Sequence, residues 1–159
     1  LGGKGNDGVA SLVSLVPGSI GYLEYTYALQ RLDKISFGLV QNSAGNFVIP
    51  DAGSFKAAAS GADWKAAKDF HLVLTDAPGE DAYPITATTF VLMPKRPKSP
   101  ERSAAAMDFV RWSLVSGRPH AETLNYVPLP LLLIDEIEHY WRKSIGAAAT
   151  VSASADVKH

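Results

Sequence analysis

The opening segment LGGKGNDG, residues 1–8, is the first place where residue types and spacing could do chemistry. A glycine loop that opens a helix leaves backbone N–H groups free to hold an anion, and Lys4 would add positive charge. Asp7 in the first helical turn would instead repel an anion, and neither the P-loop nor the GxGxxG pattern is present. Lys4, Asn6 and Asp7 therefore fit either an anion-binding loop or a plain helix cap made by Asn6 or Asp7.

Residues for nucleophilic or metal chemistry are few and scattered. The chain has no cysteine, which excludes thiolate catalysis, disulfides and cysteine-type zinc sites. Neither HExxH nor GxSxG occurs, and the four histidines are His71, His120, His139 and His159. Glu80 and Asp81 could in principle do acid–base work, but a turn before a strand explains them more simply. The sequence thus predicts no enzyme, no catalytic residue, no metal site and no cofactor.

Bulk composition excludes further classes of protein. The 159 residues carry 15 basic and 16 acidic side chains, a formal net charge of -1, so no basic excess points to a nucleic-acid partner. The hydrophobic fraction of 47% is typical of a globular chain. The longest apolar stretch, residues 126–134, contains two prolines and is shorter than the ~18 residues of a spanning helix. We therefore expect a soluble chain that does not bind nucleic acid.

Helical periodicity alternates with short apolar stretches along the chain. The predicted helices cover about 7–16, 51–61, 99–115 and 130–145. The predicted strands cover 22–25, 35–40, 70–75 and 84–93. A turn of helix should follow the first of them, and 47–50 should be a short extended piece. Pro17-Gly18 ends the first helix, Asp51 or Ser54 caps the second, and the β-branched residues of 84–93 make that strand the strongest. The alternation predicts the α/β class.

Three segments resemble one known family in their order and spacing. They are LGGKGNDGVASLVSLVPGSIGYLEYTYA at the start, GADW at 61–64 and GEDAYPITATTFVLM at 79–93. With these motifs the chain resembles the phosphate-binding receptors of Pst-type transporters, and SGRPHAETLNYVPLP fits the C-terminus of that family. The likeness runs from residue 1 to about residue 145 and is weakest at 36–51 and 66–77.

The resemblance implies an α/β receptor of the type II periplasmic-binding-protein kind, with two lobes that close on phosphate like a clamp. The chain resembles its C-terminal half: 1–78 the later part of the second lobe, 79–146 the end of the first lobe, and 147–159 a flexible tail. Both lobes would be incomplete, and residues 84–93 would cross between them as a mostly buried strand. One expected apolar cluster contains Leu12, Ile20, Tyr22 and Leu39, and the other contains Phe90, Val110, Leu114 and Trp141.

The resemblance also limits which residues can touch phosphate. The family's direct ligands lie upstream, and its Ser-Gly-Thr anion motif has no match in this sequence. No direct phosphate ligand is therefore assigned. Residues 2–7 and 85–88, with Thr88 among them, are expected to be at most cleft-proximal or hinge elements, and Pro84 and Thr86 are the candidate hinge residues.

The function implied by the resemblance is capture of inorganic phosphate and its delivery to an ABC-type importer, by a periplasmic or secreted receptor. Expected partners are phosphate, the N-terminal half of the same receptor and the transporter permease. Two alternatives use the same scaffold: a secreted enzyme of phosphorus metabolism, and a phosphate-related interaction protein. Because both lobes would be incomplete, the chain should hide less than the ~68–70% of its surface that a self-contained domain hides.

Overall fold

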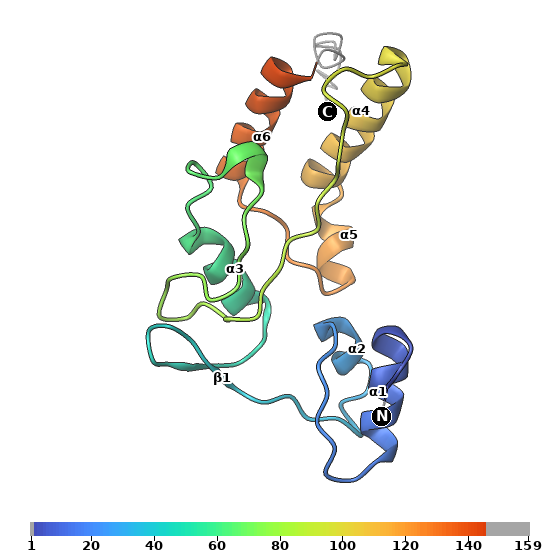
Figure 1. Ribbon diagram of the computed structural model, residues 1–159, viewed down its shortest axis with the longest axis vertical. Coiled ribbons are helices and arrows are strands. Elements are labelled where there is room, and N and C mark those ends of the chain that lie inside the picture. Colours follow the sequence, from blue (N-terminus) through green and yellow to red (C-terminus); the bar gives the residue numbers. More distant parts are fainter. Residues whose placement is uncertain (1, 146–159) are drawn as a thin grey trace.

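The computed structural model describes residues 2–145 (Figure 1). The helices are α1 (Gly5–Leu15), α2 (Tyr25–Leu29), α3 (Ala52–Gly61), α4 (Pro100–Val115), α5 (Arg118–Thr123) and α6 (Leu131–Ser144), with a 3-10 helix η1 at Lys68–Phe70. Strands β1 (Val40–Gln41) and β2 (Phe47–Val48) form an antiparallel pair, with Val40 opposite Val48. Every helix within the described residues is too short or too polar to cross a lipid bilayer. The predicted tail at 147–159 lies outside the described residues.

Helix α3 begins at a reciprocal side-chain cap. The Ser54 backbone N–H donates to Asp51 Oδ1 at 2.7 Å, and the Asp51 N–H donates to Ser54 Oγ at 3.1 Å. The two residues predicted as alternative caps therefore act together as a capping box. The helix ends at Gly61, where an added Cβ would lie 2.2 Å from the Pro78 carbonyl oxygen, so glycine lets the returning chain pack on the helix end.

The predicted helices are confirmed, but the predicted strands are not. Of the four strand segments, 22–25, 35–40, 70–75 and 84–93, only Val40 lies in a strand. A strand exists through hydrogen bonds to its neighbours. Among the described residues, no backbone–backbone hydrogen bond involves 20–23, 36–39 or 85–98. This part of the chain is therefore helix-rich with one two-stranded sheet, and lacks the larger sheet of the predicted α/β class (Figure 1).

The apolar interior consists of two small clusters. Ala58, Ala77 and Ala82 form one. Met107 and Ile145 form the other, with Met93 and Trp141 packed against them. Segment 83–92 therefore runs from one cluster, which contains Ala82, to the other, against which Met93 packs.

Most of the eight side chains that were expected to form two apolar clusters are not part of the two observed clusters. Ile20 and Tyr22 are 97% and 94% exposed, so the first expected cluster does not form. The crossing stretch was expected to be mostly buried, but this is wrong as well, since Phe90 is exposed and Leu92 is 91% exposed. These side chains belong to segments without neighbouring strands, and no second layer covers them among the described residues.

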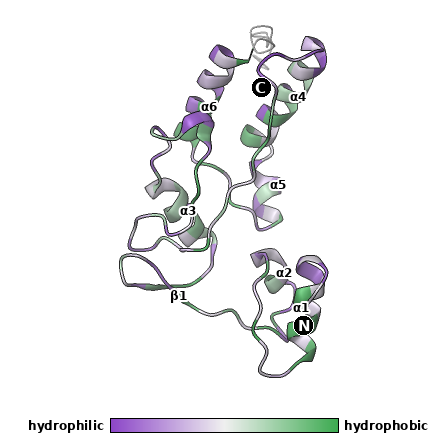
Figure 2. Ribbon diagram, in the orientation of Figure 1, coloured by the Kyte–Doolittle hydropathy of each residue, from purple (hydrophilic) through white to green (hydrophobic). Residues whose placement is uncertain are grey.

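The exposed surface is large for a chain of this size. A compact monomer of 17.0 kDa exposes ~7,700 Å², whereas this chain exposes 11322 Å². Folding hides about half of the surface of the extended chain, against ~68–70% for a self-contained domain. Figure 2 shows hydrophobic residues spread over all parts of the ribbon, including α1 and α4. These values agree with the expectation that the chain does not complete its own core.

Asn42 is a buried junction that joins the β1–β2 turn to the loop at 79–82. Its Nδ2 group donates to the carbonyl oxygens of Gly79, Glu80 and Ala82 at 2.9–3.1 Å. Its Oδ1 accepts from the backbone N–H groups of the turn, at residues 44 and 46. Asn42 is only 5% exposed, so these carbonyl groups have little access to water as an alternative partner.

Helix α6 is joined to η1 by a smaller polar cluster. The Tyr140 hydroxyl donates to the Asp69 carboxylate, and Lys95 Nζ lies 3.2 Å from the same carboxylate. The hydrogen bond from Tyr140 and then the one from Lys95 lower the pKa of Asp69. The cluster is exposed and fixes the position of η1 against α6.

Replacing Asn42 by Asp should destabilise the protein much more than its position in a turn would suggest. The substitution keeps the size but removes the Nδ2 donor and turns an acceptor toward three carbonyl oxygens. Because each lost bond and unpaired buried group costs about 1 kcal/mol or more, we expect a loss of ~2–4 kcal/mol in the free energy of unfolding. Urea unfolding measures this loss. The control is Gln41→Ala, which removes one exposed hydrogen bond; equal effects of the two variants would contradict the role of Asn42.

Candidate functional site

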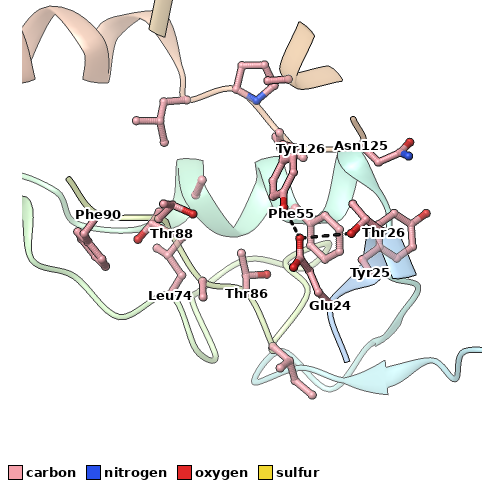
Figure 3. A pocket seen from close by; sticks show the side chains of 18 of the residues that line it. Glu24, Tyr25, Thr26, Phe55, Leu74, Thr86, Thr88, Phe90, Asn125 and Tyr126 are labelled. Atoms are coloured by element: carbon pink, nitrogen blue, oxygen red, sulfur yellow. Dashed lines mark hydrogen bonds between the residues drawn. The ribbon is translucent and has the colours of Figure 1, made fainter. Parts of the chain in front are cut away.

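An apolar hollow of about 1280 Å³ lies among the described residues. Its wall is made largely of the segments that lack strand partners, together with the connection between α5 and α6. The lining includes 19–26, 35–38, 85–93 and 125–129. Figure 3 shows Leu74 and Phe90 on one side and Glu24 with Tyr126 on the other. The hollow exceeds the ~300–1,000 Å³ of common small-ligand pockets, and its apolar wall suits a layer of polypeptide better than a small anion.

The Glu24 carboxylate is the main polar junction at this hollow. Tyr126 donates its hydroxyl hydrogen to Oε1 at 2.5 Å, and Thr26 donates to the same oxygen at 3.3 Å (Figure 3). The Glu24 backbone N–H donates to Asn6 Oδ1 at 3.0 Å. We call Glu24, Asn6, Thr26 and Tyr126 the Glu24 junction, which joins α1, α2 and the α5–α6 connection. The hydrogen bond to Glu24, and then its negative charge, raise the pKa of Tyr126.

A row of four aromatic rings begins at Tyr25, the residue that follows Glu24. Tyr25 packs edge-to-face on Phe37 at 5.7 Å and on Phe55 at 5.3 Å between ring centroids, and Phe55 packs likewise on Tyr83 at 5.5 Å. This aromatic row joins α2, the extended segment at 36–39, α3 and the start of the crossing segment. Burial raises the pKa of both Tyr25 and Tyr83, and the Asp51 charge adds to the effect at Tyr25.

The three polar residues of the opening loop make different contacts. Lys4 is the exposed N-cap of α1 and makes no side-chain cap bond, so the predicted capping by Asn6 or Asp7 is wrong. Asn6 binds Glu24, and Asp7 lies 2.7 Å from the Arg31 guanidinium. The contacts of Asn6 and Asp7 are therefore internal to the chain.

Of the two candidate hinge residues, Thr86 lines the hollow and Pro84 does not. Pro84 is buried, and its carbonyl oxygen accepts from the Asp76 N–H at 2.8 Å. The Thr86 hydroxyl donates to the Tyr83 carbonyl oxygen at 2.8 Å. Thr88 Oγ1 is buried with no hydrogen-bond partner among residues 2–145. Thr86 and Thr88 line the hollow together with Glu24, whereas Lys4, Asn6 and Asp7 are not part of its wall (Figure 3).

Sequence reasoning missed Glu24 and Tyr126 as a pair. Both lie inside segments that carry the family resemblance, GSIGYLEY and LNYVPLP, which is a signal that each position matters. Their contact spans 102 residues, and no local pattern predicts such a pairing. Among residues 2–145, no group of three or more His, Asp or Glu side chains is arranged to hold a metal ion.

An apolar hollow walled by unpaired segments is typical of a chain that associates with another polypeptide segment. The curated proteins that the chain resembles are phosphate-binding proteins. The chain is 55% identical over 141 residues, 89% of its length, to the phosphate-binding protein PstS of Xylella fastidiosa, and covers 38% of it. It is 42% identical to PstS of Pasteurella multocida, with 91% of this chain and 41% of that protein aligned. The archaeal PstS of Methanocaldococcus jannaschii is 34% identical, with 82% and 36% aligned.

The resemblance predicted from the sequence motifs is therefore confirmed, and these relatives imply a periplasmic-binding-protein fold. The chain spans about two fifths of the length of the curated relatives that it matches. No protein-family model matches the chain.

Replacing Phe55 by Leu should weaken the link between α2 and the crossing segment. The substitution keeps an apolar side chain but removes two edge-to-face ring contacts, so we expect a loss of ~1–3 kcal/mol in the free energy of unfolding. Urea unfolding followed by tryptophan fluorescence measures it. Phe47→Leu, at an exposed ring of β2, is the control. A Phe55 variant as stable as this control would show that the aromatic row does not hold the hollow's wall.

Proposed function

We propose that the chain is the C-terminal part of a receptor that captures inorganic phosphate and delivers it to an ABC-type importer. The observation that carries the proposal is its 55% identity to a phosphate-binding protein over 89% of the chain. The receptor would work in the periplasm or as a secreted protein, and the transporter permease would be its partner. The relatives are named as binding proteins, which favours binding over an enzyme of phosphorus metabolism or an interaction protein on the same scaffold.

The two apolar clusters support a division into two lobes. Residues 1–78 would complete the second lobe, and 79–146 would complete the first. The structure of 79–84 refines this division, because Asn42 and the Ser54 carbonyl oxygen hold that loop against the first part of the chain. The crossing between lobes would then begin at Pro84 and Thr86, as the hinge assignment requires.

The N-terminal half of the same receptor is the partner that best fits the hollow. Segments 20–23, 36–39 and 85–98 have no backbone partners in the described part of the chain, and added strands would supply them. The unpaired Thr88 hydroxyl lies on the same wall. About three fifths of the length of the relatives is outside the matched region, which is enough chain to fill this space.

The phosphate ligands would also come from that N-terminal half. A phosphate dianion needs several donors and positive charge to replace its water. The hollow's wall is largely apolar, and its two cations already have partners, since Arg118 donates to the Leu129 carbonyl oxygen and Lys95 lies 3.2 Å from the Asp69 carboxylate. The opening loop adds Lys4, beside the acidic Asp7. Residues 4–7 and Thr88 would therefore lie near the cleft without forming the anion site.

Calorimetric titration with phosphate tests this assignment on two samples. The 159-residue chain alone should show no sub-micromolar binding, because its ligands are missing. A receptor that carries this chain together with the N-terminal half should bind phosphate tightly and reject sulfate. Tight binding by the chain alone would overturn the assignment of the phosphate ligands to the N-terminal half. Failure of the complete receptor to bind phosphate, or its hydrolysis of a generic phosphomonoester, would overturn the proposed function.

A further inference from the structure

The Glu24–Tyr126 contact joins two parts of the chain that are far apart in sequence. Glu24 precedes α2, and Tyr126 follows α5. Their oxygen atoms are 2.5 Å apart, within the range of a charge-assisted O–H···O⁻ bond, which is about twice as strong as a neutral one. Among the described residues, this is the polar side-chain contact that connects the α1–α2 region with the α5–α6 connection (Figure 3).

Two adjacent residues thus attach α1 and α2 to the rest of the chain. Tyr25 attaches them to α3 through the aromatic row, within residues 1–78. Glu24 attaches them to Tyr126, which lies in residues 79–146. Glu24 also holds Asn6 in the first turn of α1. The Glu24 carboxylate adds a longer contact to Asn6, since Asn6 Nδ2 donates to Oε2 at 3.5 Å, so Glu24 connects α1 with the α5–α6 connection through both its backbone and its side chain.

We propose that the Tyr126–Glu24 hydrogen bond is a latch between the two lobes, made in the closed receptor and broken on opening. The proposal rests on the proposed function and on the lobe assignment above. A contact that exists only in the closed state adds its free energy to that state, and so increases the apparent affinity for the ligand that the closed state holds. Glu24 and Tyr126 are positioning residues in this scheme, since they would raise phosphate affinity without touching the anion.

The chemistry of the pair explains why both partners are needed. A phenol is a good donor to a carboxylate, and the exposed edge of the hollow lets water compete for both groups when the lobes separate. Phenylalanine at position 126 would keep the ring and lose only the donor. Alanine at position 24 would remove the acceptor, after which the Tyr126 hydroxyl should no longer matter.

Phosphate titration of the complete receptor tests the latch. Tyr126→Phe should weaken phosphate binding roughly 10-fold, as expected for loss of a charge-assisted hydrogen bond. In a Glu24→Ala background, the same substitution should change affinity less than 2-fold. Tyr27→Phe is the matched control, because Tyr27 is not part of the hollow's wall and its hydroxyl makes no hydrogen bond within residues 2–145. Unchanged affinity in Tyr126→Phe, or an equal effect in both backgrounds, would overturn the latch.

The distance between two spin labels tests the latch independently of phosphate affinity. The chain has no cysteine, so Gln30→Cys and Glu122→Cys place single spin labels after α2 and on α5. With the latch, Tyr126→Phe should lengthen or broaden the distance distribution between them, while Tyr27→Phe leaves it unchanged. An identical distribution in both variants would overturn the latch. A receptor that fails to bind phosphate would count against the proposed function, and these distances would then decide on the latch alone.

Discussion

A backbone N–H or C=O group that leaves water must find a hydrogen-bond partner. Segments 20–23, 36–39 and 85–98 find none from the backbone of the described residues, so they stay at the surface of the chain. Their side chains stay exposed with them, which accounts for the large solvent-accessible surface and the apolar hollow. Strands β1 and β2 do pair, because the turn at 42–46 brings them together locally. The lack of neighbouring strands thus explains most of the fold.

Directional contacts hold the chain where a continuous core is missing. Asn42 fixes the loop at 79–82 with three donor contacts, and the aromatic row connects that region to α2. Glu24 attaches the same short helix to the α5–α6 connection. Such contacts set geometry well, but they bury little apolar surface and therefore contribute little of the hydrophobic stabilisation that a domain of this length needs. The arrangement suits a part that is completed by another polypeptide segment.

The helices could be predicted from the sequence because their determinants are local. Apolar spacing, the Asp51–Ser54 cap and the proline before α6 all act within a few residues. Helix α5 was missed, since its six residues are too few to show an apolar stripe. Strands depend on distant partners, so the β-branched composition of 84–93 shows a preference that this chain cannot satisfy. The same limit applies to the site: the family motifs contain Glu24 and Tyr126, but only the folded chain brings them together.

Amide hydrogen exchange tests most directly whether the unpaired segments are strands that lack partners. In the 159-residue chain alone, the amides of 20–23, 36–39 and 86–93 should exchange almost as fast as in an unfolded peptide. In the proposed receptor, with the N-terminal half added, the same amides should become strongly protected, while those of α3 change little. Strong protection of 86–93 in the chain alone would show that it completes its own sheet and would contradict this account. Unchanged fast exchange in the completed receptor would contradict it equally.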